Sequence, residues 1–318
     1  MQRLAVLTSG GDASGMNATI RAVVRSAVFR GVEVFGVHQG FEGLINGEIE
    51  QMTAGSVADI IHRGGTILQT SRSEGFRTIE GREKAGGLLR AMGIENLVVI
   101  GGNGSLRGGH EFGQLGINVI GIPATIDNDV PYTASIGFDT AVNTVLDAIN
   151  RLRDTASSHG RIFVIEVMGR ECGEIALAAG VAGGAESVLI PEIKPDLTQV
   201  IEKINQGIKR GKLHSIIIVA EGVYSAMELR DKIQEETGHE TRVSILGHIQ
   251  RGGTPTAVDR ILASRMGKHA VDSICQGERN VMVAGEGDRI FSIPLQKVVN
   301  GKRMPELEMY EIAKMLSI

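Results

Sequence analysis

The sequence predicts an α/β protein whose sheets are mainly parallel and doubly wound. Three observations favour this class. Short apolar runs recur along the 318 residues, and they are continuous rather than alternating, as expected of strands that helices cover on both faces. Amphipathic stretches with helical spacing separate those runs. Many of the 43 glycines directly follow an apolar run, where a parallel sheet has its ligand-binding loops.

The clearest apolar runs are expected to be strands at 4–7, 97–100, 119–122, 162–167 and 216–220. Two helices are predicted by apolar residues three and four apart. The first has the stripe Ile20, Val23, Val24, Ala27 and Val28, and the second has Val142, Val145, Leu146, Ile149 and Leu152. Strands and helices that alternate in this way give a parallel sheet with right-handed crossovers, so the carboxyl ends of the strands meet at one edge.

Composition excludes several classes of protein. Thirty-three basic and 37 acidic residues give a net charge of −4, so generic nucleic-acid binding has no support. Two cysteines cannot build a disulfide framework, and no apolar run approaches the length of a membrane span. The chain begins without a signal-peptide pattern, so we expect a cytoplasmic protein with no membrane or nucleic-acid partner. Its length suggests about two domains, with candidate boundaries near Gly137 and at 252–255.

Three polar loops follow predicted strands: 8–17, 101–105 and 123–129. Glycine lets backbone N–H groups surround phosphate oxygens, and a helix that begins in the loop favours an anion. Each loop alone is equally well explained by turn glycines, but three at successive strand ends favour phosphate binding. The G-x-x-x-x-G-K-[ST] loop and a G-x-G-x-x-G fingerprint after a strand are both absent from the sequence.

Acidic and basic side chains in these loops are candidates for chemistry. Asp127 and Asp129 follow Thr125, and a carboxylate there could accept a hydroxyl proton or help to hold a metal ion; an Asx-turn or helix cap is the simpler alternative. Arginine suits phosphate, although a lone arginine is usually a solvated surface charge. The candidate arginines are Arg72, Arg161, Arg170, Arg242 and Arg251.

Seven segments in this order, TSGGD…GMNA, IHRGGT, VVIGG-x-GS, TIDND, VMGR, VAEG and LGHIQRGG, resemble the bacterial-type 6-phosphofructokinases over essentially the whole chain. The resemblance implies the fold of that family, two doubly wound three-layer α/β/α domains. Residues 1–137 plus 255–304 would bind ATP, and residues 138–254 plus 305–318 would bind fructose 6-phosphate. It also implies a homotetramer and a place in glycolysis.

The implied reaction transfers the γ-phosphoryl group of ATP, with Mg²⁺, to the 1-hydroxyl of fructose 6-phosphate. Asp127 would be the general base, assisted by Thr125, Asp129, Arg72 and Arg170. The ATP site would comprise Gly11, Arg72, Ser73, Gly102, Asn103, Gly104 and Ser105, with Phe41 near the adenine and Asn103 and Asp129 at the metal. The sugar phosphate would contact Thr125, Ile126, Asp127, Met168, Gly169, Arg170, Glu221, His248, Ile249, Gln250 and Arg251. Arg161 and Arg242 would reach the 6-phosphate in a neighbouring subunit.

The resemblance further implies an effector site for ADP or phosphoenolpyruvate. Its residues would be Arg21, Arg25, Arg153, Gly184, Ala185, Glu186, Arg210, Lys212, Leu213 and His214. Ala54 stands where the family usually has arginine, and Leu213 where it usually has lysine, so the response to effectors is left open.

Other departures concern the phosphates. Asn103 replaces the aspartate expected at Mg²⁺, which keeps an oxygen ligand but loses its charge, so we expect weakened use of Mg²⁺-ATP. Asn103-Gly104 is also a dipeptide prone to deamidation. Ser14 replaces a usual proline, and Glu74-Gly75 replaces Pro-Glu; both could loosen their loops.

Two alternatives to an ATP-dependent enzyme remain. A diphosphate-dependent enzyme is the first, although that class typically has lysine at position 124 and aspartate at 104, where this chain has Ala124 and Gly104. A catalytically weakened paralogue that senses sugar phosphate or nucleotide is the second, and Asn103 favours it.

Overall fold

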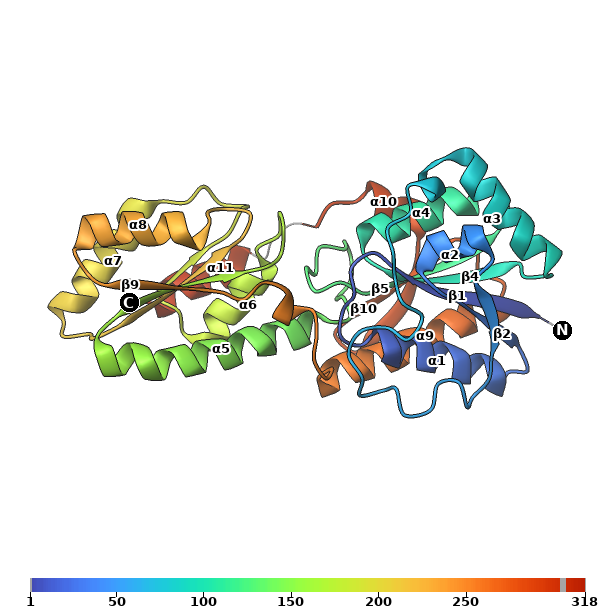
Figure 1. Cartoon of the computed structure of the whole chain (residues 1–318), viewed down its shortest axis with the longest axis horizontal. Helices are drawn as coiled ribbons and strands as arrows, with labels where there is room; N and C mark the ends of the chain where they lie inside the picture. Colours follow the sequence, from blue (N-terminus) through green and yellow to red (C-terminus); the bar gives the residue numbers. More distant parts are fainter. Residues whose placement is uncertain (1, 304–306, 318) are drawn as a thin grey trace. The chain divides into compact units, whose positions relative to one another are not determined.

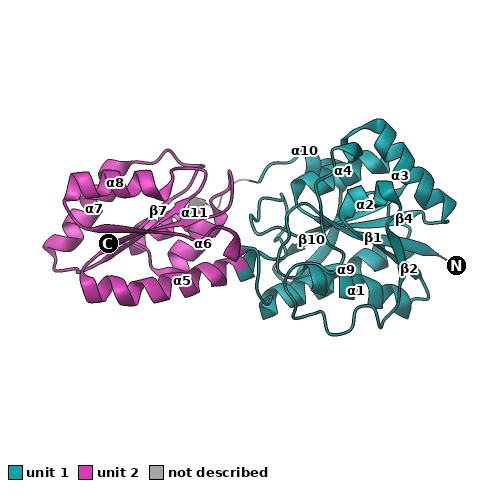
Figure 2. Ribbon diagram, in the orientation of Figure 1, with its two compact units in different colours: residues 1–140, 251–303 teal, residues 141–250, 304–318 magenta. Residues whose placement is uncertain are grey.

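The computed structural model describes residues 2–303 and 307–317. Two compact units make up the chain: unit 1 contains 1–140 and 251–303, and unit 2 contains 141–250 and 304–318 (Figure 2). The predicted boundaries were placed after residues 137, 254 and 304; the third lies outside the described residues. The division of ligands between the two units stays a prediction.

Unit 1 contains a seven-stranded sheet. Its strands are β1 (Arg3–Ser9), β2 (Glu33–Val37), β3 (Ile49–Met52), β4 (Asn96–Gly101), β5 (Asn118–Pro123), β10 (Val281–Glu286) and β11 (Arg289–Pro294). The spatial order is β11-β10-β5-β4-β1-β2-β3, and only the two edge strands, β3 and β11, pair antiparallel. The central strands β1, β4 and β5 are almost wholly buried, which explains their continuous apolar sequences.

Helices cover both faces of this sheet (Figure 1). One face carries α1 (Met16–Phe29) and α9 (Ala257–Cys275), which pack against each other. The opposite face carries α2 (Gly40–Asn46), the 3₁₀ helix η1 (Gly75–Arg77), α3 (Ile79–Ala91), α4 (Asn103–Gly113) and α10 (Leu295–Asn300). Three aromatic rings join these elements: Phe41 stacks on Phe76 at 4.0 Å, and Phe76 meets Phe112 edge-on at 5.3 Å between ring centres.

Unit 2 contains a four-stranded, wholly parallel sheet in the order β7-β8-β6-β9. The strands are β6 (Ile162–Val167), β7 (Ser187–Leu189), β8 (Ser215–Ala220) and β9 (Thr241–Ile245). Helices α7 (Leu197–Lys209) and α8 (Ala226–Thr237) share one core with β6 and β8. The other helices are α5 (Phe138–His159), α6 (Glu174–Gly183) and α11 (Leu307–Leu316), and the 3₁₀ helix η2 (Gly247–Gln250) follows β9. Figure 1 shows α5 and α6 on the face opposite α7 and α8.

The predicted α/β class is confirmed, and the five predicted strands are β1, β4, β5, β6 and β8. The two predicted helices are α1 and α5. All five residues of the first stripe lie in α1, and four of them are buried, whereas Val28 in the last turn is 42% exposed. Within the described residues, no helix combines the length and apolar character needed to cross a membrane.

Candidate functional site

The three polar loops of unit 1 lie side by side because their strands do. Strand β4 pairs with β1 and with β5, and Gly101 is the register partner of both Ser9 and Pro123. Each loop therefore starts at the same edge of the sheet, at the carboxyl ends of parallel strands. This is the edge at which open α/β sheets bind ligands.

The first loop is shaped by Arg251. A Cβ on Gly11 would lie 1.9 Å from Nη1 of Arg251, so only glycine lets the guanidinium come so close. The same nitrogen is 3.9 Å from a carboxylate oxygen of Asp12. Ser14, expected to loosen this loop, is buried, and its Oγ donates to the carbonyl of Gly253 at 2.9 Å. The serine therefore ties the loop to the segment that follows Arg251.

The second loop leads into α4. A Cβ on Gly101 would lie 2.4 Å from the carbonyl oxygen of Ser9, so the two strand ends touch through backbone. Gly104 lies in the first turn of α4 with no heavy atom within 4 Å of where its side chain would begin, whereas Ser105 is buried. An exposed first helical turn with free N–H groups suits an anion such as phosphate.

The segment that carries Arg72 and Ser73 is held beside the first loop, since Oγ1 of Thr70 donates to the carbonyl of Gly10 at 2.8 Å. Ser73 is engaged within the protein: its Oγ donates to Glu42 at 2.6 Å and accepts from the N–H of Phe76 at 3.1 Å.

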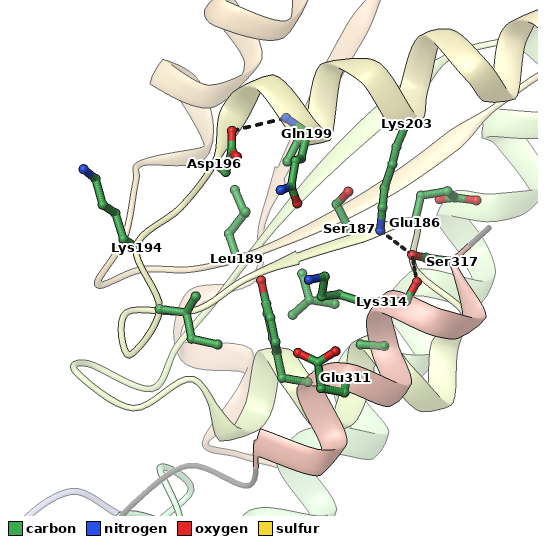
Figure 3. A pocket seen from close by; sticks show the side chains of 15 residues that line it. Glu186, Ser187, Leu189, Lys194, Asp196, Gln199, Lys203, Glu311, Lys314 and Ser317 are labelled. Atoms are coloured by element: carbon green, nitrogen blue, oxygen red, sulfur yellow. Dashed lines mark hydrogen bonds between the residues drawn. The ribbon is translucent and has the colours of Figure 1, made fainter.

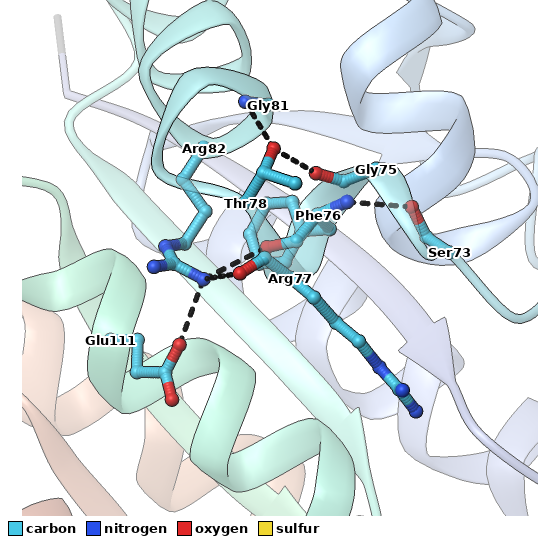
Figure 4. A network of polar contacts seen from close by, with 8 residues as sticks. All are labelled: Ser73, Gly75, Phe76, Arg77, Thr78, Gly81, Arg82 and Glu111. Carbon is cyan, nitrogen blue, oxygen red and sulfur yellow. Dashed lines mark hydrogen bonds and ion pairs between the residues drawn. The ribbon is translucent and has the colours of Figure 1, made fainter.

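Helices α3 and α4 brace that segment (Figure 4). Nη1 of Arg82 donates to the carbonyls of Phe76 and Arg77 and pairs with Glu111 of α4 at 2.8 Å. Phe41, expected near an adenine, is only 6% exposed and stacks on Phe76. The sequence analysis did not single out Glu42 or Arg82.

The third loop buries the predicted general base, since Asp127 is only 5% exposed. Its N–H donates to Oγ1 of Thr125 at 3.2 Å. Asn128 follows with a left-handed backbone (φ 52°), and its Oδ1 accepts from the N–H of Ser135 at 2.9 Å. These bonds fix the backbone on both sides of Asp127.

The second and third loops also meet through a hydrogen bond from a side chain to the backbone. Nδ2 of Asn103 donates to the carbonyl of Asp129 at 3.2 Å. The described residues contain no group of three or more His, Cys, Asp or Glu side chains able to hold a metal ion. One carboxylate at Asp129 and one amide oxygen at Asn103 do fit Mg²⁺ that arrives on a nucleotide, because Mg²⁺ takes its remaining ligands from phosphate and water.

Asp259, which the sequence analysis missed, anchors the chain after the third loop. It accepts from the N–H groups of Gly137 and Thr140, each at 2.8 Å, and from Oγ1 of Thr140 at 2.5 Å. Burial raises the pKa of its carboxyl, and these hydrogen bonds oppose that rise. A sequence signal existed, because Thr256 and Asp259 have the spacing of a helix capping box at the start of α9.

In unit 2, the residues predicted to hold the sugar gather at the carboxyl end of β6. Oε1 of Glu221 accepts from the N–H of Arg170 at 2.9 Å and from that of Gly169 at 3.3 Å. Oε1 of Gln250 accepts from the N–H of Met168 at 3.3 Å. Glu221 and Gln250 thus shape the backbone turn that presents the Arg170 side chain, while His248 and Ile249 are exposed beside Gln250.

Arg161 and Arg242 lie at the opposite edge of the same sheet. Arg161 directly precedes β6, whereas Met168 directly follows it, and a strand of this length spans about 20 Å. Both arginines bind one carboxylate: Nε of Arg161 donates to Glu240 at 2.9 Å, and Nη2 of Arg242 donates to the other oxygen. Within one chain, these two arginines and Arg170 therefore belong to different sites.

Most predicted effector residues of unit 2 also cluster. Arg153 donates to the carbonyls of Gly183 and Gly184, and Lys212 pairs with Glu186. Oγ of Ser157 and Nδ1 of His214 are 3.1 Å apart, and Ala185 is buried. Arg210 caps the end of α7, and Leu213 is 69% exposed.

Beside Glu186, α7 and α11 border a cavity of about 610 Å³ that the sequence analysis did not anticipate (Figure 3). Lys203 and Lys314 line it, and Nζ of Lys203 donates to Oγ of Ser317 at 2.5 Å. In unit 1, Arg21 and Arg25 lie one turn apart on the solvent side of α1, and Ala54 is exposed.

Known proteins resemble this chain along its whole length. A family model described as phosphofructokinase matches residues 3–274. ATP-dependent 6-phosphofructokinases of Natranaerobius thermophilus and Bacillus subtilis are 56% and 54% identical, each over all of both chains. The structure of phosphofructokinase from Saccharomyces cerevisiae superimposes with a TM-score of 0.89 at 33% identity, and it covers all of this chain but 48% of the yeast one. The chain belongs to the phosphofructokinase family.

Proposed function

We propose that this protein is an ATP-dependent 6-phosphofructokinase, which transfers the γ-phosphoryl group of ATP to the 1-hydroxyl of fructose 6-phosphate. One observation carries the proposal: three polar loops, two of them rich in glycine, open at neighbouring strand ends, and the third buries Asp127. Relatives that bear this name match the chain over its full length, which supports the same reaction.

The donor phosphates would bind the loops at Gly11 and at 102–105, with the first turn of α4 and Arg72 supplying positive potential. Mg²⁺ would arrive with ATP, and Asn103 and Asp129 are the residues that would contact it. When bound, the metal would supply neutralisation of the phosphate charge. Because Asn103 is neutral, this chain contributes one negative charge fewer to that ion than an aspartate would.

On the acceptor side, Asp127 would take the proton of the 1-hydroxyl. A bond then forms between that oxygen and the γ-phosphorus, while the bond to the β–γ bridging oxygen breaks and ADP leaves. Thr125 would hold the loop in place through the N–H of Asp127. Arg170, presented by the turn that Glu221 fixes, would stabilise the transferring phosphoryl group.

Arg161 and Arg242 support a shared site. They lie one strand length from Arg170, so they would serve a substrate bound to a neighbouring subunit, as a homotetramer allows. ADP and phosphoenolpyruvate are the proposed effectors, and Ala54 and Leu213 remove two cations that the family pattern would place with the phosphates.

A coupled assay with Mg²⁺, fructose 6-phosphate and either ATP or diphosphate tests the proposal. We expect turnover with ATP and little with diphosphate, because this chain has Ala124 and Gly104 where the diphosphate-dependent class typically has lysine and aspartate. Preferred use of diphosphate would contradict the proposal that ATP is the phosphoryl donor. Binding of ATP and sugar phosphate without turnover would instead favour the sensor.

A further inference from the structure

Glu240 holds together two arginines that the proposed function assigns to a phosphate. Strand β9 pairs with β6 so that Ile162 is the register partner of Thr241, which brings Arg161 beside Glu240 across the two strands. Arg242 is two residues beyond Glu240 and projects from the same face of its strand. Each arginine donates to a different oxygen of the carboxylate.

Arg161 and Arg242 form a small anion-binding site, and the carboxylate of Glu240 occupies it. The hydrogen bond from Arg161 lowers the pKa of the Glu240 carboxyl, and Arg242 lowers it further, so Glu240 is ionised at neutral pH. Two guanidinium groups that converge on one pair of oxygens present the geometry that also suits a phosphate group.

Space for a ligand lies next to Arg242, one of the two arginines. A cavity of about 400 Å³ between α8 and β9 is lined by Arg242 and by Arg230. All three members of the Glu240 cluster are at least partly exposed, with side chains 27%, 46% and 56% accessible for Arg161, Glu240 and Arg242. Within a single chain, the carboxylate can therefore swing away from the arginines without opening the core.

We propose that Glu240 is an internal competitor that sets the affinity of Arg161 and Arg242 for a phosphate monoester. A phosphate dianion cannot take both arginines while the carboxylate keeps them, because the two anions would repel each other at contact distance. Glu240 therefore leaves when phosphate enters, and its attraction to the arginines is subtracted from the binding free energy of the phosphate. The identity of the phosphate ester rests on the proposed function; the competition itself does not.

The experiment compares Glu240→Gln with wild type by titrating inorganic phosphate in a calorimeter. We expect the variant to bind phosphate roughly three- to tenfold more tightly, in keeping with the loss of two exposed ion pairs. Glu236→Gln removes a nearby exposed glutamate of α8 and is the matched control, with no change expected. Adding Glu240→Gln to Arg161→Gln/Arg242→Gln should give no gain, which separates this site from any other phosphate site.

Steady-state kinetics give a second measurement. In Glu240→Gln the KM for fructose 6-phosphate should fall by a similar factor, while kcat and the KM for ATP stay unchanged. Weaker phosphate binding in the variant, or an equal gain in the control, would overturn the competition. If wild type does not turn over fructose 6-phosphate but Glu240→Gln still tightens phosphate binding, the proposed function fails and the competition stands.

Discussion

Asp127 combines burial with a fixed backbone, and that combination suits a general base. Replacing it with asparagine keeps the size and one oxygen but removes the proton acceptor. We expect Asp127→Asn to lower kcat by roughly 10²- to 10⁴-fold with a small change in the KM for ATP. The coupled assay measures this, and an unchanged circular dichroism spectrum would show that the fold is retained. If the variant turned over within a few-fold of the wild-type rate, Asp127 would not be the general base.

Asn103 is the residue at which this chain departs most from the charge expected near Mg²⁺. An aspartate there would add a negative charge facing the metal but could not donate to the carbonyl of Asp129, as the amide does at 3.2 Å. We expect Asn103→Asp to raise kcat roughly tenfold and to lower the Mg²⁺ concentration needed for half-maximal rate.

A magnesium titration of the rate measures both quantities for Asn103→Asp. Asn103→Ala serves as the comparison, because it removes the amide without adding charge. Equal rates and equal magnesium dependence in wild type and Asn103→Asp would show that the charge at 103 does not matter.

The sequence was enough to identify many candidate site residues, but it did not reveal which groups those residues contact. The glycine loops and Asp127 stand out because strand ends are visible as apolar runs. That Glu221 holds the sugar stays a prediction, but the sequence did not reveal that its Oε1 accepts from the N–H groups of Gly169 and Arg170. Such bonds depend on the register of strands far apart in sequence, which apolar periodicity does not reveal. Glu240 was not predicted to be a partner of Arg161, because the two residues meet only through the pairing of β6 with β9.

At the scale of elements, Asp259 joins α9 to the start of α5. Because burial raises its pKa above the ordinary value of 3.8, the folded protein binds more protons at this group than the unfolded chain does just above that pH. The stabilisation of the folded protein that comes from this raised pKa of Asp259 is therefore fully present below pH 3.8. It is lost as the pH rises through the pKa that Asp259 has in the folded protein.

Asp259→Asn resembles the protonated acid but leaves donors without an acceptor, so we expect it to be less stable than wild type by about 1–3 kcal/mol. The deficit should narrow as pH rises from about 4 to 7, since only wild type has to ionise a buried carboxyl. Urea unfolding across this range measures the difference, and Asp288→Asn in an exposed turn is the control. A deficit that widens with pH would contradict the raised pKa.

Elements that are buried on both faces were the easiest to predict. Strands β1, β4, β5, β6 and β8 are continuous apolar runs. The interior strands β2 and β10 and the four edge strands β3, β7, β9 and β11 were not singled out. Edge strands have one solvent-exposed side and fewer apolar residues, so their sequences resemble loops. Ser14 illustrates a related limit, because the carbonyl that fixes it belongs to Gly253, 239 residues away.

For the whole molecule, the proposed function uses the separation of Arg161 and Arg242 from Arg170, because subunits would then complete one another's sites. We expect Arg170→Gln and Arg161→Gln/Arg242→Gln to be nearly inactive when each is prepared alone. When equal amounts are unfolded together and refolded as mixed oligomers, about one quarter of wild-type activity should return, because half of the sites have an intact Arg170 and half of those meet an intact neighbour. Wild type refolded in parallel corrects for yield. No recovery would place all three arginines in one subunit's site.

The open surroundings of Gly104 have a consequence for the purified protein over time. Spontaneous loss of ammonia from an Asn-Gly pair needs the glycine nitrogen to reach the preceding side chain. Beyond its chain neighbours and the backbone of its own helix, no heavy atom lies within 4 Å of where a Cβ on Gly104 would be. The hydrogen bond from the side-chain amide of Asn103 to the carbonyl of Asp129 opposes this reaction, because it restrains the amide. A stored preparation would then slowly acquire the acidic side chain that its gene does not encode, and its specific activity would drift with age.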